Sequence, residues 1–82
     1  MILEILSPKE NFFKGEVSSI IFPGTNGKFQ VLNNHAPLIS FLTKGDIIYV
    51  KNNKEEKLSI KNGIVEILEN KICALIEESQ KS

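Results

Sequence analysis

His35 and Cys73 are the side chains best suited to catalysis or metal binding, and the chain has one residue of each type. A metal site needs three or four converging ligands, which one His and one Cys do not supply. They could form a nucleophile–base pair only if the fold brought them together, and nothing in the sequence does so. We expect His35 to hydrogen-bond within its own loop or to contact a partner. We expect Cys73, which lies among apolar neighbours and has no disulfide partner, to be a small buried hydrophobe.

The segment Pro23–Lys28, Pro-Gly-Thr-Asn-Gly-Lys, is a candidate phosphate-binding loop. It lacks the spacing of a P-loop and precedes a strand-like run instead of a helix, whose N-terminus would bind the anion. We interpret it as a tight turn with two glycines. The acidic pairs Glu55-Glu56 and Glu77-Glu78 would point to opposite faces of a strand and would share no site. The sequence thus predicts a binding or structural module with no catalytic residues, cofactor or metal.

Length and charge limit the class of protein. The chain has 82 residues, the size of one small domain, and its ten basic residues, all lysines, balance ten acidic residues to a net charge of zero. Such balance argues against a protein that binds nucleic acid or an anionic membrane, because both need excess cationic charge. No segment approaches the ~18–20 apolar residues that span a bilayer, and a single cysteine suits a reducing compartment. We expect a soluble, intracellular domain without direct membrane insertion.

Short apolar runs between turn signals predict an all-β fold, an antiparallel sandwich or barrel. Asn62-Gly63 predicts a type I′ hairpin turn, and Asn52-Asn53-Lys54 and Asn70-Lys71 predict similar reversals. The last segment, Ile76–Ser82, could begin a helix but is too short to hold one alone. The predicted strands are Ile2–Leu6, Glu16–Phe22, Phe29–Leu32, Leu38–Leu42, Ile47–Lys51, Lys57–Lys61, Ile64–Leu68 and Ile72–Ile76.

A longer motif runs from Phe22 to Gly45 and is more specific than turn chemistry. It reads Pro-Gly, two residues, Gly, a strand-like run, His-Ala-Pro-Leu, a short apolar run and a closing Gly. Related motifs flank it at Leu3–Pro8, Phe13–Val17 and Ile60–Ile67. With these motifs in this order, nearly the whole chain resembles the epsilon subunit of F-type ATP synthases.

The resemblance implies a fold and a function. The fold would be all-β, a flattened antiparallel β-sandwich of about eight to ten short strands over residues 1–77, then a short polar tail over 78–82. The function would be that of a non-catalytic rotor subunit of the central stalk. It would bind the gamma subunit and the polar loops of the c-ring and so couple ion-driven rotation to ATP synthesis. The subunit would act as a monomer within a hetero-oligomer, peripheral to the cytoplasmic face of the bacterial inner membrane.

The resemblance also implies which residues meet partners. The turn of Gly24, Thr25, Asn26, Gly27 and Lys28 falls where the family presents its ring-facing edge. The residues His35, Ala36, Pro37 and Leu38 fall where the family meets gamma and the edge of the ring. At Lys28 many relatives carry an acidic residue, so a ring with basic loops would repel this turn.

The sequence departs from the family's usual length. Family members usually continue into two α-helices that can inhibit ATP hydrolysis and in some relatives bind ATP. Here no C-terminal helical domain follows, so we expect neither autoinhibition nor nucleotide binding through this subunit, and we interpret the polar ending as a natural short form.

Two expectations separate this interpretation from its alternative. A rotor subunit should expose an apolar patch rimmed by polar residues, because it must dock on partners. The alternative is a biotinyl or lipoyl carrier domain of a multi-domain enzyme. Such a domain would need an acceptor lysine at a hairpin tip, where Lys54 lies, but the flanking Asn-Asn-Lys-Glu-Glu does not match the carrier motif.

Overall fold

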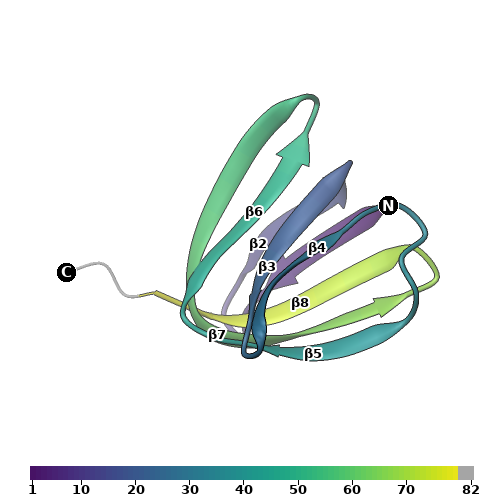
Figure 1. Ribbon diagram of the computed structural model, residues 1–82. Helices are drawn as coiled ribbons and strands as arrows, with labels where there is room; N and C mark the ends of the chain where they lie inside the picture. Colours follow the sequence, from purple (N-terminus) through teal and green to yellow (C-terminus); the bar gives the residue numbers. More distant parts are fainter. Residues whose placement is uncertain (80–82) are drawn as a thin grey trace.

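The computed structural model describes residues 1–79, and the described residues form eight β-strands and no helix (Figure 1). None of this part of the chain can therefore cross a membrane as a helix. The strands are β1 (Ile2–Leu6), β2 (Asn11–Glu16), β3 (Ser19–Gly24), β4 (Gly27–Val31), β5 (Leu38–Leu42), β6 (Gly45–Lys51), β7 (Lys54–Leu68) and β8 (Lys71–Glu78).

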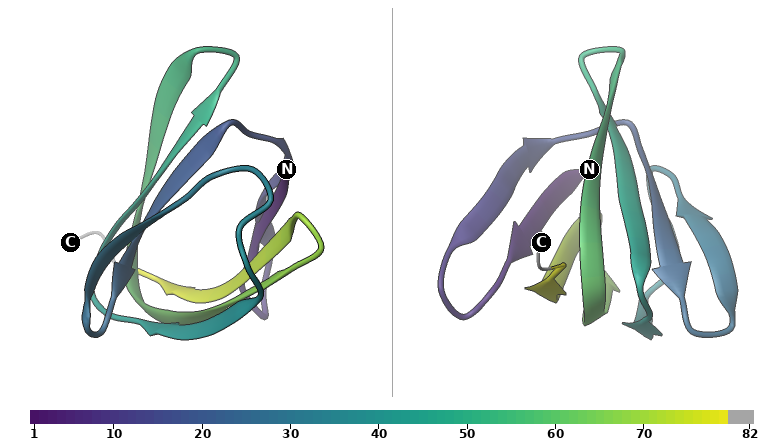
Figure 2. Two further views of the ribbon diagram at one scale, coloured as in Figure 1. Left: turned by 45° about the vertical axis from the view of Figure 1, so that its right-hand side comes forward. Right: turned by 90° about the vertical axis from the view of Figure 1, so that its left-hand side faces the viewer.

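The strands form one sheet that folds over on itself (Figures 1 and 2). One layer runs in the order β2-β1-β8-β7-β5, and the other contains β6, β3 and β4. The fifteen-residue β7 belongs to both layers, because its first half pairs with β6 and its second half pairs with β5 and β8. The predicted all-β sandwich is confirmed, with one difference: β1 and β8 pair in parallel, whereas the other pairs among the described strands are antiparallel.

The core lies between the layers and is entirely apolar. In β8 Ile72, Ala74 and Ile76 point inward while the residues between them face solvent, as the period of two of a strand requires. Phe22 is the largest fully buried side chain, and its ring lies 5.6 Å from that of Phe29, centroid to centroid. No polar or charged side chain of the described residues is buried, so the core contains no unpaired polar group.

The predicted hairpin at Asn62-Gly63 is wrong, because both residues lie inside β7. A β-bulge between Ile60 and Asn62 bends the strand, and Gly63 pairs with β5 on one side and β8 on the other. A Cβ on Gly63 would lie 2.8 Å from the carbonyl oxygen of Leu75, so the close approach of strands explains the glycine. The pairing of β7 with β5 and β8 outweighs the local preference of Asn-Gly for a turn.

The other two predicted reversals exist. Asn52 and Asn53 both have positive φ, 51° and 63°, and connect β6 to β7 as a two-residue turn. The second reversal is formed by Glu69 and Asn70, at φ 50° and 63°, one residue earlier than predicted. Asparagine is common in such turns because it tolerates left-handed backbone.

Strand boundaries differ from prediction near both ends of the chain. The predicted run Glu16–Phe22 is divided: Glu16 ends β2, which the sequence analysis missed, and β3 begins at Ser19. At the other end β8 continues to Glu78, so no helix begins at Ile76. Of the predicted polar tail over 78–82, residues 80–82 lie outside the described part of the chain.

Candidate partner-binding surfaces

The predicted ring-facing turn joins β3 to β4 and has a backbone that needs its two glycines. A Cβ on Gly24 would lie 2.7 Å from the carbonyl oxygen of Gly27, and Gly27 has φ +119°, which side chains disfavour. The Thr25 N–H donates to the carbonyl oxygen of Phe41 (3.1 Å), which ties the turn to β5. The side chains from Thr25 to Lys28 are exposed. The turn is therefore a fixed, solvent-exposed feature with no phosphate-binding helix behind it.

The loop that holds His35 joins β4 to β5 and is tied to its surroundings by hydrogen bonds. His35 Nδ1 lies 2.7 Å from the carbonyl oxygen of Ala36, and the His35 N–H donates to the carbonyl oxygen of Leu32 (3.2 Å). The Asn34 N–H donates to Oδ1 of Asn70 in the β7–β8 turn (2.8 Å). The expectation that His35 hydrogen-bonds within its own loop is thus confirmed.

The rest of the predicted gamma-facing segment divides between solvent and core. Ala36 and Pro37 are exposed, whereas Leu38 is half-buried and packs against the core. This segment and the β3–β4 turn lie at opposite ends of β4 (Figure 2). The residues predicted from the sequence therefore form two separate surfaces.

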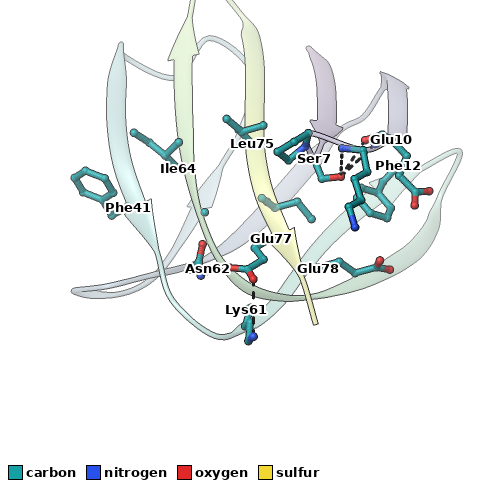
Figure 3. Close-up of a pocket in the computed structure, with 14 residues that line it drawn as sticks. Ser7, Glu10, Phe12, Phe41, Lys61, Asn62, Ile64, Leu75, Glu77 and Glu78 are labelled. Atoms are coloured by element: carbon teal, nitrogen blue, oxygen red, sulfur yellow. Dashed lines mark hydrogen bonds and ion pairs between the residues drawn. The ribbon is translucent and has the colours of Figure 1, made fainter. Parts of the chain in front are cut away.

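A row of apolar side chains crosses the outer face of the sheet, and the sequence analysis did not single it out (Figure 3). Phe41 on β5 pairs with Ile64 on β7, which pairs with Leu75 on β8, which pairs with Leu6 on β1. We call these four residues the apolar row. Phe41 is 65% exposed and Leu75 44% exposed, and Ile39, on the same side of β5, is 64% exposed. A large apolar residue at every position but one of Leu38–Leu42 was the available signal, because both faces of that strand must be apolar.

Polar groups border the apolar row at the end of the sheet where β7 bends. The Asn62 amide nitrogen donates to Oε1 of Glu77 (2.9 Å), and the Lys61 ammonium lies 3.8 Å from Oε2 of the same carboxylate. On the β1–β2 side, Ser7 Oγ accepts from the N–H groups of Lys9 and Glu10, both at 3.2 Å. The expected apolar patch with a polar rim is therefore confirmed.

Cys73 is exposed, so the prediction of a buried cysteine is wrong. It occupies an outward position of β8 between its cross-strand neighbours Glu4 and Glu66. Partial burial, followed by the charges of Glu4 and Glu66, raises the pKa of the Cys73 thiol above its ordinary value. The thiol therefore stays protonated at neutral pH and is a poor nucleophile. Within residues 1–79 no three His, Cys, Asp or Glu side chains are arranged to hold a metal ion.

A small β-sandwich that exposes apolar side chains on one sheet has the type of surface on which other proteins dock. Residues 1–81 match the family described as the β-sandwich domain of the ATP synthase delta/epsilon chain. The chain belongs to this family. The family is not that of the biotinyl or lipoyl carriers, so we do not retain an acceptor role for Lys54.

Individual relatives agree with the family assignment. The chain is 42% identical over 77 residues to the ATP synthase epsilon chain of Chlorobaculum tepidum, covering 93% of this chain and 88% of that one. It is 40% identical over 78 residues to the epsilon chain of Desulfitobacterium hafniense, covering 95% of this chain and 59% of that one. The chain thus spans most of one relative and little more than half of the other.

Solved structures show the same fold. A chain of the Euglena gracilis mitochondrial ATP synthase superposes with a TM-score of 0.89 at 21% identity, covering 95% of this chain and 51% of that one. A chain of the central stalk and c-ring of the Tetrahymena thermophila enzyme superposes with a TM-score of 0.81 at 12% identity, covering 94% and 63%.

Proposed function

We propose that this chain is a non-catalytic central-stalk subunit of an F-type ATP synthase, which binds the gamma subunit and the polar loops of the c-ring. In this role it would be one monomer of a hetero-oligomer at the cytoplasmic face of the bacterial membrane. Family membership supports the assignment to the complex. The observation that carries the binding role is the exposed apolar row.

The apolar row is our candidate for the gamma-binding surface. Its residues stand on four hydrogen-bonded strands, so a partner would meet a preformed platform and little chain ordering would oppose binding. A stable interface buries about 800 Å² per partner. The described surface totals 5501 Å², so such an interface would cover roughly one seventh of it.

The β3–β4 turn is our candidate for the ring-facing contact. Its side chains from Thr25 to Lys28 are exposed, and its backbone is held to β5, so it would present a fixed shape to a rotating partner. Lys28 makes this turn positively charged, and acidic or neutral ring loops would therefore suit it better than basic ones. His35 and Pro37, at the far end of β4, remain candidates for a contact with gamma or the edge of the ring.

Calorimetry of the purified chain with its cognate gamma subunit tests the proposal. We expect a one-to-one complex whose formation lowers the heat capacity, because apolar surface is buried. Absence of binding at high micromolar concentration would contradict the proposal that this domain suffices to bind gamma. Reconstitution with the c-ring and gamma together would then decide whether the chain enters the stalk at all.

A further inference from the structure

The chain contains two Asn-Gly steps, Asn26-Gly27 and Asn62-Gly63, and the fold places them in opposite environments. The first lies in the exposed β3–β4 turn. The second lies inside β7 with paired strands on both sides. The same two-residue sequence therefore occurs once where the backbone is accessible and once where it is held, which makes one step an internal control for the other.

Asn-Gly sequences can undergo a spontaneous intramolecular reaction. The backbone nitrogen of the glycine attacks the side-chain carbonyl carbon of the asparagine. A new N–Cγ bond forms, the Cγ–Nδ2 bond breaks, and ammonia leaves. Water then opens the resulting five-membered imide at either carbonyl to give aspartate or isoaspartate, with no oxidant or reductant required. Glycine favours the reaction because it has no Cβ to hinder the attack and allows the backbone rotation that the attack needs.

The environment of Asn26 leaves this reaction open. Asn26 is exposed, and no hydrogen bond joins its side-chain amide to any group of residues 1–79. Gly27 is exposed, and no atom lies within 4 Å of the point where its Cβ would be. Thr25 and Asn26 form the whole turn, and the Gly24–Gly27 pair ends the β3–β4 ladder, so rotation at Asn26-Gly27 would open only the terminal pair of one ladder.

The environment of Asn62 opposes the reaction at both reacting atoms. Its side-chain amide donates to Glu77 Oε1 at 2.9 Å, and this hydrogen bond restrains the rotation of the side chain that the attack on Cγ needs (Figure 3). Gly63 pairs with Leu42 of β5 and Ile76 of β8, and its Cβ position lies 2.8 Å from the Leu75 carbonyl oxygen. Rotation of the Asn62–Gly63 backbone would therefore have to open two ladders, a local unfolding event.

We propose that Asn26 is a site of spontaneous deamidation in the folded protein and that Asn62 is protected from it. The product places a carboxylate two residues before Lys28, so the charge of the turn changes from positive to neutral. If the turn faces the ring, as proposed above, this chemistry would change the charge of that contact as the protein ages. The deamidation itself does not depend on the proposed function.

Peptide mapping with the intact folded chain tests the proposal. Trypsin cleaves after Lys14, Lys28, Lys61 and Lys71, so the two Asn-Gly steps fall in separate peptides. The chain is incubated at neutral to mildly alkaline pH in ¹⁸O-labelled water, digested at mildly acidic pH, and analysed by fragmentation mass spectrometry. We expect conversion at Asn26 to exceed conversion at Asn62 by about tenfold or more. A tenfold difference in rate needs the opening of the two ladders around Gly63 to cost only about 1.4 kcal/mol.

Two controls assign the cause. In concentrated urea both steps should convert at similar rates, because the protection of Asn62 comes from the fold. Asn26→Gln should remove the label from the first peptide, since glutamine would need a larger ring. Equal conversion at both sites in the folded chain, or an Asn26 that converts far more slowly folded than unfolded, would overturn the proposal.

Discussion

Replacing Phe41 by alanine is the sharpest test of the apolar row, because this side chain is the most exposed of the large hydrophobic residues described. A buried Phe removes about 200 Å² from water, so the 65% that is exposed corresponds to roughly 130 Å² available to a partner. At about 25 cal/mol per Å² this area is worth about 3 kcal/mol if gamma covers it fully. Since alanine retains part of that area, we expect the Kd for gamma to rise by about 30- to 100-fold.

The same substitution should leave folding almost unchanged. Phe41 contributes little to the core, so the expected change in the free energy of unfolding lies within the ~1 kcal/mol span of strand preferences. The matched control is Lys54→Ala, at the tip of the β6–β7 hairpin, which projects from the body far from the apolar row (Figure 2). Calorimetric titration with gamma gives the Kd, and thermal melts by circular dichroism give the stability of each variant.

The two possible outcomes decide whether the apolar row binds gamma. Loss of affinity for Phe41→Ala with normal binding by Lys54→Ala supports the apolar row as the gamma-binding surface. Wild-type affinity of a folded Phe41→Ala would refute the reasoning, because a residue with this much exposed apolar area cannot be central to an interface and energetically silent.

Three further predictions concern the fold and the thiol. Gly63→Ala should lower the free energy of unfolding by about 1–3 kcal/mol in urea melts, because the new Cβ meets the Leu75 carbonyl oxygen; an unchanged midpoint would mean that the strands can separate there. Gly27→Ala should cost a similar ~1–3 kcal/mol through backbone strain alone, since space around it is open. Alkylation of Cys73 should accelerate as the pH rises above the ordinary pKa range of a cysteine thiol. Glu66→Gln should speed alkylation at a fixed pH by lowering the pKa of the thiol, and equal rates for Glu66→Gln and the wild type would contradict the electrostatic cause.

The raised pKa of Cys73 also determines whether stability rises or falls with pH. Its folded pKa lies above the unfolded value, so its contribution to stability is fully present below the unfolded pKa and is lost as pH rises through the folded one. Burial, followed by the charge of Glu56, raises the pKa of Tyr49 in the same direction. Both groups therefore predict alkaline destabilisation, which begins as the pH passes the ordinary pKa of a cysteine thiol and grows as it passes that of a tyrosine phenol.

Strands that turn residues bound on both sides were predictable from the sequence. β1 and β5 begin and end as predicted, at Ile2–Leu6 and Leu38–Leu42, because turn residues flank both. Strand β2 was missed because Asn11–Glu16 contains adjacent phenylalanines and a glycine, which give no alternation. Asn11–Glu16 forms a strand because it pairs with β1, although its own sequence has no strand pattern.

The remaining errors have a common physical cause, which is contact between residues distant in sequence. Asn62-Gly63 has the strongest local preference for a hairpin turn, yet β5 and β8 hold it in a strand. Cys73 lies among apolar neighbours in the sequence. It faces solvent because Ile72 and Ala74, on either side of it in β8, both point into the core. The apolar row likewise exists only after four strands are brought into register, so spacing along one strand could not reveal it.

The two proposed contact surfaces are mechanically joined, and the connection follows from two backbone hydrogen bonds. The Thr25 N–H donates to the carbonyl oxygen of Phe41 (3.1 Å), and the Thr43 N–H donates to the carbonyl oxygen of Pro23 (2.8 Å). The turn that would face the ring is thus fastened to the strand that begins the apolar row. β5 pairs with β7 and β7 pairs with β8, so a force applied at the turn would reach the proposed gamma-binding surface through hydrogen-bonded strands without crossing a loop. A coupling element between two rotor parts needs this stiffness, since any compliance would let ring and stalk turn by different amounts.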